Sequence, residues 1–107
     1  MVFITTPTRH QAQTIGRRLV QERLAACVQV FGPVTSSYRW QGRLERSREW
    51  LCLVKTERRR LDQVVALVKR LHSYQLPELI ALPISAGSPD YLKWLGAELA
   101  APRRTDG

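Results

Sequence analysis

Few side chains in this chain could bind a transition metal. They are His10, His72, Cys27, Cys52 and nine acidic residues, and none has the CxxC, HxH or HExxH spacing of a compact metal motif. His72 is the best candidate ligand, with Glu78 as a second and Cys27 as a third. The competing interpretation is that His72 only interacts favourably with the C-terminus of the helix that it ends. A site shared between subunits would gather more ligands than one chain does.

A thiol nucleophile with an imidazole base is the second chemistry that these residues could support, with Cys27 and His72 as the pair. Cys27 lies in an apolar strand pattern, which does not activate a thiol. The chain also lacks a glycine-rich nucleophile turn and a paired-carboxylate motif. We therefore expect a binding protein rather than an enzyme.

A polar cleft for a small ligand is the third candidate site. Lys55 ends an apolar strand, and Tyr74 follows the second helix, so a subunit junction there would form a cleft. An aromatic side chain of a neighbouring subunit would then form its wall. The alternative is that Lys55 simply pairs with an acid such as Glu49 or Glu57. The residues of this predicted cleft are Lys55, Tyr74, Tyr38 and Trp40.

The elements that must position these residues predict a single α+β domain. The length of 107 residues and a hydrophobic content of 44% suit one packed core. Apolar periodicity predicts the order β-α-β-β-α-β, which is the ferredoxin-like plan, followed by an extra C-terminal helix. Residues 1–101 form this domain and residues 102–107 a polar tail. The predicted strands cover residues 1–5, 25–40, 43–56 and 77–84.

Several residues predict where these elements begin and turn. Thr8 with Gln11 predicts a capping box for the first helix, and Thr56 predicts a cap for the second. Gly32 and Pro33 predict a bend or bulge in the second strand. A hairpin turn at Gln41 and Gly42 would place Trp40 opposite Arg43 and Cys27 opposite Thr56. That register argues against a disulfide between Cys27 and Cys52.

The strands are apolar on both faces, whereas the helices of this plan cover only one face. The long hairpin also reaches about 50 Å when extended, at ~3.3 Å per residue, and would overhang its own core. Aromatic side chains on such an overhang serve well as interface anchors. We therefore expect a closed homo-oligomer. The predicted interface residues are Tyr38, Trp40, Leu44 and Trp50, of which Trp50 fits the core equally well.

The charge of +8 and the sequence pI near 10.5 raise the question of nucleic-acid binding. The arginines are scattered, and no RRM, KH, zinc-finger or recognition-helix pattern accompanies them. Solvated surface charge is the simpler interpretation, and a nucleic-acid binder remains an alternative. The chain shows no pattern typical of a signal peptide and no apolar run of about 20 residues. We expect a cytoplasmic protein without membrane partners.

Five separated motifs resemble the CutA divalent-cation-tolerance family over about residues 1 to 99. They read "ERLAACVQV", "VTSSYRWQGRLE", "LVKT", "LHSYQLPELIALPISAG" and "YLKWL". The resemblance implies a ferredoxin-like homotrimer linked to tolerance of copper and other divalent ions, without catalytic activity. Its long hairpins would build inter-subunit sheets, an architecture similar to the PII signalling proteins.

Within these motifs, His72 and Tyr74 match the family's "HPY" pattern, but Ser73 replaces its proline. Ile4 and Leu71 stand where some members have a cysteine and a second histidine. The implied cofactor is Cu(II) or another divalent cation, not required for folding. The alternative function is a PII-like regulator that binds a small metabolite or a protein partner in the inter-subunit cleft.

Overall fold

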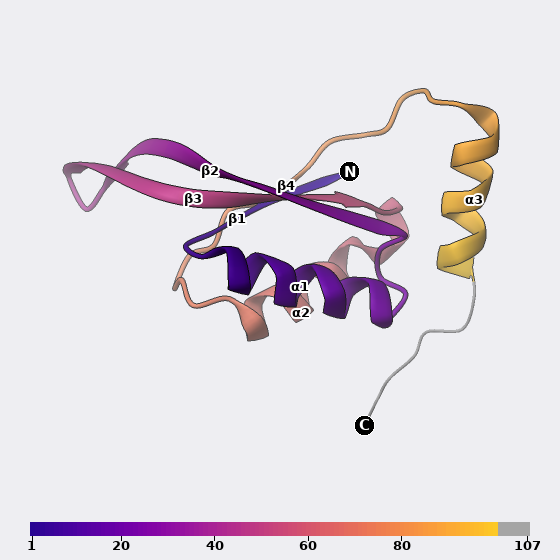
Figure 1. Ribbon diagram of the computed structural model, residues 1–107, viewed down its shortest axis with the longest axis horizontal. Helices are drawn as coiled ribbons and strands as arrows, with labels where there is room; N and C mark the ends of the chain where they lie inside the picture. The colour runs from indigo at the N-terminus through magenta and orange to yellow at the C-terminus, as the bar shows by residue number, and fades with distance from the viewer. Residues whose placement is uncertain (101–107) are drawn as a thin grey trace.

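The computed structural model of the protein describes residues 1–100 (Figure 1). Four strands form one antiparallel sheet in the order β2-β3-β1-β4. This order, with two helices between the strands and a third after them, confirms the predicted α+β ferredoxin-like fold with its extra helix. The predicted tail lies outside the described residues. The elements are β1 (Val2–Thr6), α1 (Arg9–Gln21), β2 (Cys27–Trp40), β3 (Arg43–Lys55), the short 3₁₀ helix η1 (Arg58–Arg60), α2 (Leu61–Leu71), β4 (Leu79–Ala81) and α3 (Pro89–Ala100).

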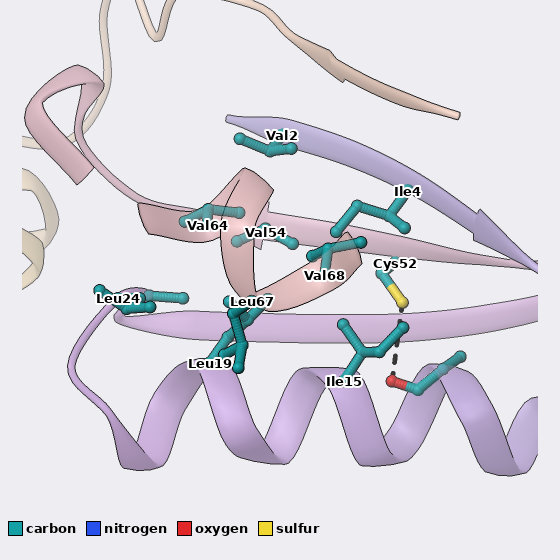
Figure 2. Close-up of a cluster of buried hydrophobic side chains, with 12 residues drawn as sticks. Val2, Ile4, Ile15, Leu19, Leu24, Cys52, Val54, Val64, Leu67 and Val68 are labelled. Atoms are coloured by element: carbon teal, nitrogen blue, oxygen red, sulfur yellow. Dashed lines mark hydrogen bonds between the residues drawn. The ribbon is translucent and has the colours of Figure 1, made fainter. Parts of the chain in front are cut away.

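Helices α1 and α2 lie side by side on one face of the sheet, and the apolar core fills the space between them and the strands (Figures 1 and 2). Cys52 belongs to this core, where its thiol donates a hydrogen bond to the Ala12 carbonyl over 3.7 Å. Burial raises the pKa of the Cys52 thiol to about 11, so this cysteine is inert. The core residues are Val2, Ile4, Ala12, Ile15, Leu19, Leu24, Ala25, Cys52, Val54, Val64, Leu67 and Val68.

Helix α1 begins as its capping residues predict. The Thr8 hydroxyl accepts a hydrogen bond from the Gln11 backbone N–H over 3.1 Å. The Gln11 side chain does not return to Thr8 and instead accepts bonds from the Ser73 N–H and hydroxyl, each over 3.3 Å. This half of the capping box therefore joins the start of α1 to the segment after α2.

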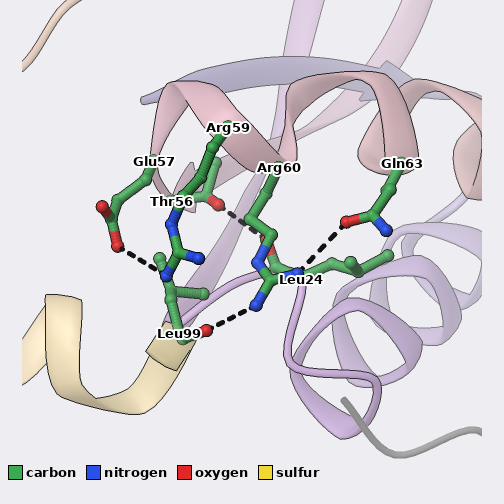
Figure 3. A network of polar contacts seen from close by, with 7 residues as sticks. All are labelled: Leu24, Thr56, Glu57, Arg59, Arg60, Gln63 and Leu99. Atoms are coloured by element: carbon green, nitrogen blue, oxygen red, sulfur yellow. Dashed lines mark hydrogen bonds and ion pairs between the residues drawn. The ribbon is translucent and has the colours of Figure 1, made fainter. Parts of the chain in front are cut away.

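The predicted cap at Thr56 is wrong. Its hydroxyl instead donates to the Leu24 carbonyl over 2.7 Å, which joins the end of β3 to the loop before β2 (Figure 3). Helix α2 is preceded by η1, and the residue at its N-cap, Arg60, makes no side-chain capping bond. The Arg60 guanidinium donates to the Leu99 carbonyl over 2.6 Å and so attaches α3 to the domain.

The hairpin of β2 and β3 has the predicted turn, with Trp40 opposite Arg43. The register shifts at Gly32 and Pro33, where two residues of β2 oppose one residue of β3, as the predicted bulge requires. Because of this extra residue, Cys27 lies opposite Lys55, and the prediction that it faces Thr56 is wrong by one position. Both cysteines are free.

The bulge divides the hairpin into a part that packs on the helices and a projecting part. We call the projecting part, residues 34–49, the hairpin arm; it extends well beyond α1 and α2 in Figure 1. Its aromatic side chains, Tyr38 and Trp40, are exposed, and Leu44 near the tip is 77% exposed. Trp50, just below the arm, instead packs against the core.

The second face of the sheet has no helix in the described part of one chain. Leu51 and Leu53 alternate with the buried Cys52 and Val54, so they point to this open face. Strand β4 covers less than predicted, only Leu79–Ala81 instead of residues 77–84, because the following residues pair no further with β1. No helix within residues 1–100 is long and apolar enough to cross a bilayer.

Candidate functional site

A groove of about 480 Å³ lies between the hairpin arm and the loop that follows α2. The arm contributes two aromatic rings and one carboxylate, β1 contributes one threonine, and the loop contributes five consecutive residues. Both apolar and acidic side chains therefore meet in a single concave surface. The lining residues are Thr5, Tyr38, Trp40, Glu49, Tyr74, Gln75, Leu76, Pro77 and Glu78.

The alternation of side chains along the strands explains which arm residues reach the groove. Beyond the bulge, Val34 pairs with Glu49 and Tyr38 with Glu45, so these residues share one face of the hairpin. The same alternation connects Glu49 to Leu51 and Leu53, which point away from the helices. The groove therefore opens on the sheet face that α1 and α2 leave uncovered.

The loop side of the groove is fixed by His72, the C-cap residue of α2. His72 is buried, and its Nε2 lies 2.6 Å from the Thr5 carbonyl oxygen. Its Nδ1 accepts the Tyr74 backbone N–H over 3.0 Å. An Nδ1 that accepts is unprotonated, and Nε2 must then carry the proton that it donates to Thr5. Both ring nitrogens are therefore occupied in holding the loop against β1.

Glu49 gives the groove a negative charge at its inner end. Its residue surface is only 6% exposed, and no Lys, Arg or His forms an ion pair with it within residues 1–100. Burial, followed by the charge and hydrogen bond of Glu49, raises the pKa of Tyr74 to about 12. Tyr74 therefore keeps its proton at neutral pH and can donate it to the Glu49 carboxylate.

The structure brings together part of the predicted ligand cleft. Tyr38, Trp40 and Tyr74 line the groove with Glu78, and all four belong to the same chain. Lys55 does not line it. The Lys55 ammonium lies 2.5 Å from Gln29 Oε1, a different partner from either acid proposed for it.

The three predicted metal ligands do not converge within one chain. Cys27 lies level with Lys55, whereas His72 bonds to Thr5, which pairs with Leu51, four residues further along β3. Residues 1–100 contain no group of three or more His, Cys, Asp or Glu side chains that could hold a metal ion. The same separation keeps the Cys27 thiol away from the His72 imidazole.

Sequence reasoning missed Glu49 as a lining residue and treated it only as a partner for Lys55. One signal could have revealed it. Glu49 continues the alternation of Leu51 and Leu53 on the open face, so a carboxylate follows directly on an apolar row. The loop residues Gln75, Leu76 and Pro77 carried no comparable pattern.

The sequence matches the family described as CutA1 divalent ion tolerance protein over residues 1–98. A divalent-cation tolerance protein CutA from Thermus thermophilus is 47% identical over 95 residues, which cover 89% of this chain and 92% of the relative. The human protein CutA is 38% identical over 93 residues, covering 87% of this chain. The chain spans only 52% of the human relative and 62% of the Xenopus laevis relative.

Solved structures agree with these sequence matches. The divalent cation tolerance protein from Thermus thermophilus superposes with a TM-score of 0.86 at 48% identity, covering 88% of this chain and 91% of that one. CutA1 from Oryza sativa gives a TM-score of 0.89 at 35% identity, covering 97% and 93%. Sequence and fold match over nearly the whole described domain, so the chain belongs to the CutA divalent-cation tolerance family.

Proposed function

We propose that this protein supports tolerance to divalent cations by binding copper or another divalent cation as a homotrimer, without catalytic turnover. Family membership carries this proposal, because the chain spans 92% of a relative named as a divalent-cation tolerance protein. The separation of Cys27 from His72 favours binding over a thiol-based reaction.

The apolar surface of a single chain supports the trimer. Phe31 is 47% exposed and Ile80 is 52% exposed, and Leu51 and Leu53 point to the same uncovered sheet face. Tyr38, Trp40 and Leu44 extend this surface along the arm. Contiguous exposed apolar surface of this kind marks protein interfaces. Sedimentation at micromolar concentration should give about three times 12.3 kDa, and a folded species of 12.3 kDa would contradict the trimer.

A cation site shared between subunits fits the donors that one chain presents. Glu78 is exposed and Cys27 is half-buried, so donors from another subunit could complete a site at either residue. His72 could bind a cation only by giving up one of its two hydrogen bonds.

Metal content after Cu(II) loading tests this arrangement. Glu78→Gln and Cys27→Ser variants should each be compared with the parent protein, and His10→Ala provides a histidine control. Loss of bound copper in either of the first two variants supports the shared site. Full copper binding by both would contradict it.

A cytoplasmic location is part of the same proposal. The two thiols are free, as expected of a reducing compartment. A solved relative from Archaeoglobus fulgidus is described as periplasmic, so the location needs a direct test. Fractionation of the source cells should recover the protein with cytoplasmic markers, and recovery with periplasmic markers would refute this part.

A further inference from the structure

We propose that the groove between the hairpin arm and the loop after α2 binds a small organic cation, an amine, amidinium or guanidinium carried on a flat or short apolar body. This inference goes beyond the proposed metal function and does not depend on it.

The charge of the groove is the first argument. Glu49 is 6% exposed at its inner end, and Glu78 is exposed at its rim. A buried carboxylate is stable only when hydrogen bonds or a counter-charge replace its lost water. Within the described chain, Glu49 has the Tyr74 hydroxyl and no cationic partner. The groove is therefore complete on the acceptor side and lacks the cation.

The surrounding protein makes this arrangement informative. The chain carries a net charge of +8, with seventeen basic residues to nine acidic ones. Two carboxylates in one groove of such a basic protein form a local exception, and no arginine or lysine lines that groove. A cation would be recognised there by short-range contacts and not by the overall field of the protein.

The walls of the groove decide between an organic and an inorganic cation. Tyr38 and Trp40, 41% and 40% exposed, stand on the arm, and Leu76 and Pro77 stand on the loop. Aromatic faces attract ammonium and guanidinium groups, and apolar walls bury the body that carries them. A divalent metal ion instead requires several converging donor atoms. The volume of about 480 Å³ lies within the usual range for small-molecule sites.

Benzamidine and benzamide form a suitable pair of probes, because they have nearly the same shape and only benzamidine is charged at neutral pH. The readout is the indole N–H signal of Trp40 in a ¹H–¹⁵N correlation spectrum, assigned with the Trp40→Phe variant. Benzamidine should shift this signal in a saturable way, and benzamide at equal concentration should not.

Variants then connect the binding to the carboxylates. Glu49→Gln keeps the size of the side chain and should weaken benzamidine binding about tenfold or more, because bonds to charged groups are worth ~1.5–3 kcal/mol. Glu78→Gln, at an exposed position that folding does not depend on, should weaken it less, by about threefold. Glu45→Gln makes the same change on the same strand outside the groove and should leave the binding unchanged.

Three results would overturn the proposal. The first is equal binding of benzamidine and benzamide, and the second is unchanged benzamidine binding in both groove variants. The third is a fall in the oligomeric mass of Glu49→Gln, since the cation would then be a side chain of another copy of this chain. The mass and copper content of the parent protein are measured separately, so the metal proposal can fail or succeed independently.

Discussion

Replacing His72 by leucine removes two hydrogen bonds that close the loop onto the sheet. The side chain changes little in volume, but the Thr5 carbonyl loses its donor and the Tyr74 N–H loses its acceptor. A buried polar group left without a partner costs about 1–3 kcal/mol. Thr5 is 7% exposed and pays the larger share, whereas the half-buried Tyr74 N–H can recover a bond to water. The expected loss in free energy of unfolding is about 2–4 kcal/mol.

Urea denaturation at one fixed protein concentration measures this loss, because self-association makes the midpoint depend on concentration. The other histidine of the chain, His10, is exposed on α1, so His10→Leu is a matched control that should change the free energy by less than about 0.5 kcal/mol. Long-range ¹⁵N spectra of the parent protein should show His72 with Nδ1 unprotonated and Nε2 protonated. Equal stability of the two variants would refute the assignment of His72 as the residue that holds the loop.

Three further changes test the fold around the site. Gly32→Ala would place a Cβ atom 2.9 Å from Trp50 Cδ1 and should cost about 1–3 kcal/mol of unfolding free energy; wild-type stability in urea would contradict the packing at the bulge. Because burial raises the pKa of Cys52 from 9.0 to about 11, stability should fall as pH rises from about 9 towards 11, and at pH 8 a thiol reagent should modify Cys27 but not Cys52 until urea is added. Thr56→Val should cost about 1–2 kcal/mol while Thr56→Ser retains the hydroxyl bond, so equal losses in thermal unfolding would exclude a role for that bond.

The elements themselves could be predicted because their apolar periodicity is strong. Leu19 in α1 and Val64 in α2 recur at helical spacing and are buried, and Cys52 and Val54 alternate with Leu51 along β3. Local residues also indicated the turn before Arg43 and the bulge. What failed was a cap that depends on tertiary context: the Thr56 hydroxyl found a carbonyl 32 residues away before it could cap a helix.

The site was harder to predict because it combines segments that are distant in sequence. The aromatic residues of the arm were recognised, but their assignment to a neighbour's cleft did not foresee that a loop of the same chain, with Tyr74 and Glu78, would meet them. His72 was chosen as a ligand by residue type. The hydrogen bonds that occupy both of its nitrogens depend on where β1 runs, and no sequence pattern near residue 72 reports that.

The extra residue in β2 decides which chemistry the arm presents. Below the bulge, even-numbered residues such as Val28 and Val30 point to the helices, whereas above it Tyr38 pairs on the groove side. Deleting one residue at position 32 or 33 would restore an unbroken alternation and rotate every arm side chain of β2 by half a turn. Arg39 would then take the place of an aromatic ring, and a surface suited to positive guests would become one that repels them.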